Sequence, residues 1–173
     1  MIGLISQDIF KHLKADDAQR TVDGNTYYID PSDHRPLWEI MGMKSAVGIE
    51  KRIVPGIQPD LVEDNLPIIE HLVTPVGENS VSGTLSFRVV FRIMSNDYSF
   101  IELNAVSRRV RALMLVDKKM LWNAVPPSGR YNQPFYAYAD TGNQTTDMAG
   151  IYSRMITIAG ETGPQVDLID RPK

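Results

Sequence analysis

The alternation of hydrophobic and polar residues is clearest in residues 84–116, where it predicts a long strand followed by a helix. In the strand every second residue is apolar, which gives it one buried face. Arg88 and Arg92 fall between these positions, so the other face is largely polar and cationic. After Asn96 the apolar spacing changes to three and four residues, which is typical of an amphipathic helix. The apolar positions are Leu85, Phe87, Val89, Phe91 and Ile93 in the strand, then Leu103, Val106, Val110 and Leu113 in the helix.

Shorter elements are predicted on both sides of this pair. Residues 2–13 carry a helical stripe, and residues 22–29 contain a turn that leads into a short strand. The remaining predicted strands are residues 65–74, 134–139 and 150–158. Residues 77–80 and the polar stretch from Asp140 to Asp147 are predicted as loops that join neighbouring strands. Such short connections favour antiparallel pairing.

These elements predict an α+β fold with a mixed, mainly antiparallel sheet packed by two helices. Residues 1–159 form one domain in this prediction, and the apolar face of the long strand packs on the stripe of the following helix. Residues 30–50 contain prolines and glycines that interrupt regular structure, so we expect an irregular insertion outside the sheet, less ordered or dependent on a partner. Residues 160–173 are polar and are predicted to form an extended tail, mobile or bound to a partner.

Composition narrows the range of functions. The chain has 173 residues, of which 43% are hydrophobic and 23% charged, as in an ordinary globular protein. Its net charge of −3 argues against a general polycation that coats nucleic acid or a membrane. Cysteine is absent, which excludes disulfides and thiol nucleophiles and fits synthesis in a reducing cytoplasm. We expect no transmembrane helix and no signal peptide.

The sequence offers few candidates for catalysis. The histidines His12 and His71 lie in predicted regular elements, where a structural role is favoured. Asp30, Asp33 and His34 could converge on a divalent ion, but a turn in which Asp and Ser cap backbone amides is the favoured interpretation. No phosphate-binding loop motif is present. We therefore expect neither an enzyme nor a bound cofactor or metal, and a small metal-binding enzyme is kept as a lesser alternative.

The arginines of the predicted helix are the most distinctive polar feature. Three arginines, Arg108, Arg109 and Arg111, lie off the apolar stripe within four positions. Their positive charges repel one another unless acidic groups neutralise them. They form either a solvated face or a contact with a neighbouring subunit, and less readily with DNA phosphates. Acidic candidates on such a neighbour are Glu50, Glu63, Asp64, Glu70 and Glu78. The full set of predicted interface or lumen positions is Arg88, Arg92, Arg108, Arg109, Arg111, Asp140 and Asp147.

The order of elements resembles the tail-terminator, or tail-completion, proteins of long-tailed bacteriophages. Four stretches carry the resemblance: residues 2–13, 66–73, 84–113, and the closing hairpin around 140–147 with residues 152–158. Residues 30–50 and the tail after Ala159 depart from the pattern.

The resemblance implies an α+β subunit of a homo-oligomeric, hexameric ring in the tail-neck region of a virion. Such a ring caps the finished tail tube, stops its growth and joins the tail to the head. The implied partners are the tail tube protein and the head–tail connector or neck proteins. DNA passes through the lumen without specific binding, and no membrane is involved. The related alternative is a head-completion protein or neck adaptor.

Overall fold

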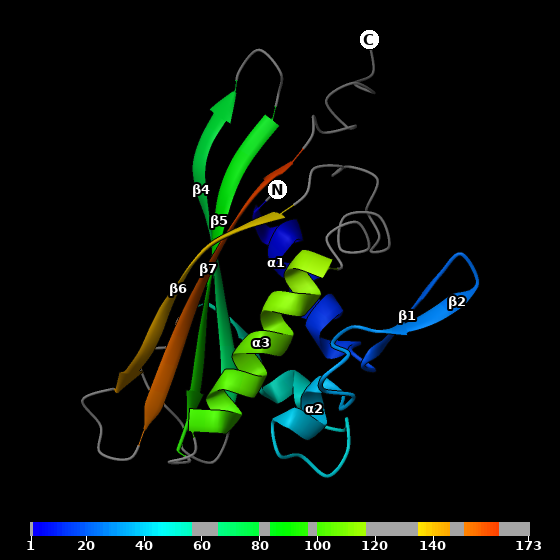
Figure 1. Ribbon diagram of the computed structural model, residues 1–173. Helices are drawn as coiled ribbons and strands as arrows, with labels where there is room; N and C mark the ends of the chain where they lie inside the picture. The colour runs from blue at the N-terminus through cyan, green and yellow to red at the C-terminus, as the bar shows by residue number, and fades with distance from the viewer. Residues whose placement is uncertain are drawn as a thin grey trace.

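The computed structural model describes residues 2–56, 66–79, 84–96, 100–116, 135–145 and 151–162. Figure 1 shows one long sheet with helices packed on one of its faces. In chain order the elements are α1 (Ile2–Lys14), β1 (Gln19–Val22), β2 (Asn25–Tyr28), α2 (Leu37–Ile40), the 3-10 turn η1 (Ile49–Lys51), β3 (Ile53–Pro55), β4 (Ile68–Asn79), β5 (Thr84–Ser95), α3 (Phe100–Val116), β6 (Phe135–Thr145) and β7 (Tyr152–Thr162). Among the described helices, none is both long and apolar enough to cross a membrane.

The main sheet has five strands in the order β3-β4-β5-β7-β6. All neighbouring pairs are antiparallel except β3 and β4, which run parallel. Helix α1 packs against β3 and β4, and α3 packs across β5, β6 and β7. The predicted α+β fold, with a mixed, mainly antiparallel sheet packed by two helices, is therefore confirmed. Strand β3 was not predicted, because three residues after a 3-10 turn are too few to show alternation.

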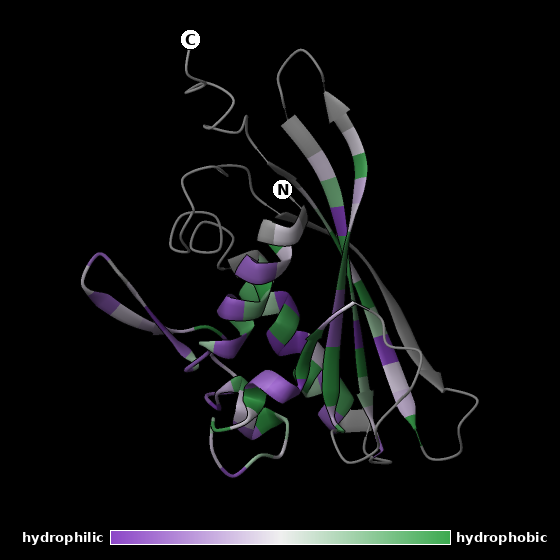
Figure 2. Cartoon of the chain, turned by 180° about the vertical axis from the view of Figure 1, so that it is seen from behind, coloured by the Kyte–Doolittle hydropathy of each residue, from purple (hydrophilic) through white to green (hydrophobic). Residues whose placement is uncertain are grey.

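The core lies between the helices and the sheet. The inward residues of β5, from Phe87 to Ile93, are at most 1% exposed, and they share one cluster with the apolar stripe of α3. The predicted packing of this strand on this helix is confirmed, although the side chain of Leu85 lies outside the described set. The stripe of α1, formed by Ile5, Ile9 and Leu13, joins the same cluster. Figure 2 shows hydrophobic residues along the strands and on the helix surfaces beside them.

Residues 30–50 lie outside the sheet, as their prolines and glycines predict. They nevertheless contribute to the core, because Leu37, Ile40, Met41 and Ile49 are all buried in the main cluster. Helix α2 contacts α3, so this segment covers the side of α3. Faster amide exchange here than in β5 stays a prediction.

Three predicted boundaries are wrong, because the strands are longer than the sequence indicated. Strand β4 continues to Asn79 through residues predicted as a loop, β6 includes Asp140, and β7 continues to Thr162, past the predicted start of the tail. Register shifts in the β4–β5 and β6–β7 pairs explain two of these cases. Such bulges accommodate turn-prone residues within a continuing strand. Asp147 and residues 163–173 lie outside the described residues.

Candidate assembly surface around helix α3

The three arginines of α3 lie in three different environments. Arg108 is exposed, with 63% of its side chain accessible. Its Nε lies 2.7 Å from Asp30 Oδ2, and its Nη2 donates to Asp30 Oδ1 at 3.1 Å. Arg109 is buried, and Arg111 is half-buried beside a pocket. Neighbouring residues of a helix point about 100° apart, which follows from 3.6 residues per turn.

Arg109 is an internal residue. Its side chain is 1% exposed, its Nη1 donates to Asp16 Oδ2 at 2.9 Å, and its Nη2 donates to the Asp33 carbonyl at 2.6 Å. Asp16 also accepts hydrogen bonds from the backbone N–H groups of Ala18 and Leu37. The pair thus joins α3 to the end of α1 and to the segment that leads into α2.

The interface prediction for Arg109 is therefore corrected, because a guanidinium buried within its own chain cannot contact a neighbour. The helical pattern placed this residue off the apolar stripe correctly. It could not show that the segment before α2 covers that side of the helix.

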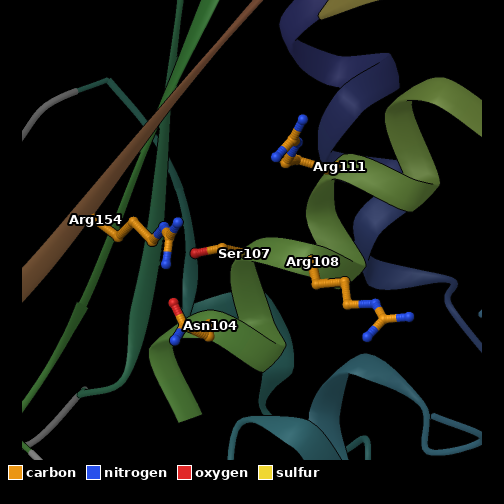
Figure 3. Close-up of a pocket in the computed structure, with 5 residues that line it drawn as sticks. All are labelled: Asn104, Ser107, Arg108, Arg111 and Arg154. Atoms are coloured by element: carbon orange, nitrogen blue, oxygen red, sulfur yellow. The ribbon is translucent and has the colours of Figure 1, made fainter. Parts of the chain in front are cut away.

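A cationic pocket of about 470 Å³ lies between α3 and β7. Its described lining residues are Asn104, Ser107, Arg108, Arg111 and Arg154, and no acidic side chain is among them. Figure 3 shows Arg154 pointing from β7 toward Ser107 and Asn104, while the guanidinium of Arg108 points the opposite way. A carboxylate or a phosphate is the chemical group that such a pocket suits.

Arg154 is the pocket residue that the interface prediction missed. Its register partner in β5 is Ile93, so it lies on the sheet face that the helices cover. The signal was present in the sequence as a charged residue that interrupts the apolar side of the last strand. The fold was needed to bring it opposite α3.

Arg88 and Arg92 lie on the other face of the sheet, because they alternate with the buried residues of β5. Arg88 is exposed. Arg92 donates to Glu70 Oε1 from Nε at 2.9 Å and from Nη2 at 2.7 Å, and the Glu70 side chain is fully buried. Glu70 is therefore already paired across β4 and β5 and not an open acid for a neighbouring subunit. The structure separates these arginines from those of α3.

The Asp30–His34 segment is a turn held by hydrogen bonds. Asp30 accepts from the backbone N–H and the hydroxyl of Ser32, and Asp33 accepts from Arg35 Nε at 2.9 Å. Burial raises the pKa of Asp30, but the Ser32 hydrogen bonds and the nearby arginines outweigh it, so the net shift is downward. The hydrogen bond from Arg35 lowers the pKa of Asp33. Within the described ranges, no group of three His, Asp or Glu side chains is placed to hold a metal ion.

The other two histidines have partners inside the fold. His12 Nε2 lies 3.2 Å from the Leu113 carbonyl, which links α1 to α3. His71 is buried, and its Nε2 lies 3.0 Å from the hydroxyl of Ser6. Burial lowers the pKa of His71, which favours the neutral ring. A Ser–His pair is also found in nucleophilic catalysis, where a third group orients the histidine, but none of the described residues bonds to His71 Nδ1.

The comparisons with known proteins give a likeness of fold. No family model matches the sequence, and no curated protein matches it. Among solved structures, the chain is similar to a protein chain of the virion of a native gene transfer agent particle, with a TM-score of 0.58 and 8% identity. The match covers 91% of this chain and 93% of that chain. At this identity the likeness establishes a shared fold, and it extends over almost the whole of both chains.

Proposed function

We propose that this protein is a structural subunit of a phage-like virion. The observation that carries the proposal is the likeness of almost the entire chain to a chain of a gene transfer agent virion. Because both chains are covered nearly end to end, the likeness concerns a whole subunit and not a common small motif. We expect the protein to function through contacts between subunits and not as an enzyme, and to be located in the virion after synthesis in the host cytoplasm.

The more specific role that we propose is a tail terminator. In this role a homo-oligomeric ring, of six subunits by family resemblance, caps the tail tube, stops its growth and joins the tail to the head. The element order that resembles terminator proteins supports this choice, since α1, β4, β5, α3 and β7 all occur in the expected order. The partners are then the tail tube protein and the connector or neck proteins, and DNA passes through the lumen.

Deletion of the gene from its phage or particle-producing genome tests this role. A terminator deletion should give tails of uncontrolled, excessive length beside unjoined, filled heads, seen by electron microscopy. Purified protein added back should restore joining. Tails of normal length that fail to join would instead assign the protein to head completion or the neck. Complete, infectious particles from the deletion strain would contradict every virion role.

We further propose that the pocket on α3 lies at a subunit boundary or in the lumen and receives an acidic group. Arg111 is half-buried in this pocket, so reversal to Glu places a negative charge where an anion should bind. Arg111→Glu should weaken assembly or head–tail joining and leave the circular dichroism spectrum unchanged. The matched control is Lys44→Glu, which makes the same change at an exposed position outside the pocket. If both variants assembled as well as the wild-type protein does, the pocket would not bind an acidic group at a subunit boundary.

A further inference from the structure

The hairpin of β1 and β2 projects from the body formed by the helices and the main sheet, as Figures 1 and 2 both show. Its two-residue turn, Asp23 and Gly24, has φ values of 51° and 79°. A two-residue type I′ turn requires positive φ at both positions, and its twist matches that of the flanking strands. At its base, the Ile29 N–H donates to the carbonyl of buried Ala18 at 3.0 Å, which fixes the direction of the hairpin.

The two tyrosines of this hairpin are used differently. Tyr27 is the register partner of Arg20 and Tyr28 that of Gln19, so their side chains lie on opposite faces. Tyr28 stacks on His34, with ring centroids 3.6 Å apart and planes 3° from parallel. Tyr27 is 57% exposed, a larger fraction than for any other tyrosine, phenylalanine or tryptophan whose burial is described. Tyrosine on an open hairpin face is a side chain suited to burial in a protein interface.

A mainly apolar groove lies elsewhere on the same chain, between α1 and β3. It has a volume of about 410 Å³, and its lining includes Gln7, Phe10, Glu50, Lys51, Val54 and Pro55. Strand β3 is an edge strand, but Pro55 has no N–H to donate to an added strand. The groove therefore favours insertion of a side chain over extension of the sheet.

We propose that Tyr27 of one copy inserts into the α1–β3 groove of the next copy. An aromatic projection then meets an apolar concavity, and the charges at the exposed tip of the hairpin and beside the groove are complementary, because exposed Asp23 of the turn suits exposed Lys51. The two surfaces differ, so the contact is head-to-tail, the type that closes into a ring when the rotation permits. This inference rests on the ring of the proposed function, and it names the surfaces that build it.

Two variants, each damaging one surface, test the contact in purified protein. Tyr27→Asp places a charge on the hairpin face, and Gln7→Trp fills the groove from an exposed position of α1. Each alone should weaken self-association at least roughly 10-fold, the effect of losing an interface hot spot. The matched controls are Thr21→Asp on the opposite face of the hairpin and Lys11→Trp one turn further along α1. Both should assemble as the wild type does, and circular dichroism should show all four folded.

Mixing the two damaging variants gives the decisive result. One keeps its groove and the other keeps its hairpin, so the mixture should form a one-to-one pair and nothing larger in native mass spectrometry. Normal rings from either variant alone, absence of the mixed pair, or a wild type that stays monomeric would each overturn the contact. A failure of the tail role would appear separately, as normal tails in the deletion strain, with the pair still measurable.

Discussion

Arg108 and Arg109 are adjacent on α3, and each is paired with an aspartate, but their surroundings differ completely. Arg108 is 63% exposed beside Asp30, while Arg109 and the side chain of Asp16 are both buried. Exposed ion pairs contribute little because water and salt screen them, whereas breaking a buried pair leaves a charge without compensation. The comparison shows that charge pattern alone does not separate a structural arginine from a surface one. Burial does.

The largest predicted effect follows from breaking the buried pair. Arg109→Leu should lower the free energy of unfolding by about 3–5 kcal/mol, because Asp16 is left buried without its cation. Chemical denaturation followed by circular dichroism measures this loss. The double variant with Asp16→Asn should lose less than the sum of the two single changes, since no unpaired charge remains. A loss below about 1 kcal/mol for Arg109→Leu, the range of an exposed pair, would contradict a special contribution of burial to the Arg109–Asp16 pair.

The same contrast explains how far the sequence could predict the fold. Helices and strands with one buried and one solvated face have a periodic pattern of apolar residues. The stripes of β5, α1 and α3 were predicted from this pattern, and the structure confirms them. Strand β3 and the extensions of β4 and β6 have no such pattern, because they are very short or contain bulges. Local periodicity reports one element at a time, whereas these features depend on a neighbouring strand.

The candidate site shows the same division. Arg108 and Arg111 were predicted as a cationic surface, and the structure places both at one pocket. Arg109 was misassigned and Arg154 was missed, for one shared physical reason. The environment of each arginine depends on a segment that is distant in sequence. The turn before α2 covers Arg109, and β7 places Arg154 beside α3. A single sequence contains the charges but not these juxtapositions.

A second buried carboxylate, that of Asp8, differs from Asp16 because it has no hydrogen-bond partner among the described residues. Asp16 accepts three hydrogen bonds, whereas both carboxylate oxygens of Asp8 accept none from the described part of the chain, although the residue is only 3% exposed. Burial raises the pKa of Asp8 from 3.8 to about 6, with a smaller opposing effect from Lys11. The folded chain therefore binds this proton more tightly than the unfolded chain. Asp8 thus destabilises the fold progressively as the pH rises from about 4 to above 6.

Asp8→Asn should consequently stabilise the protein at pH 7, by at most about 3 kcal/mol, since one pKa unit corresponds to about 1.4 kcal/mol. The gain should shrink steadily as the pH falls toward 4, because there the folded carboxyl is protonated and the unfolded one, with a pKa of 3.8, becomes partly protonated as well. Thermal melts of both proteins between pH 4 and pH 7 measure this difference. The same gain at every pH would mean that the charge of Asp8 is not its cause.

The smallest effect is expected at the exposed pair. Arg108→Gln should change the free energy of unfolding by no more than about 1 kcal/mol, because the guanidinium is largely solvated. Asp30 keeps both hydrogen bonds from Ser32, which lower its pKa more than the charge of Arg108 does, so most of that lowering should persist. Salt at about 1 M, where the screening length falls to about 3 Å, should remove most of the small difference between variant and wild type. Denaturation at low and high salt measures both quantities beside Arg109→Leu. If Arg108→Gln were as damaging as Arg109→Leu, or if salt left its effect unchanged, exposure would not be what distinguishes the two arginines.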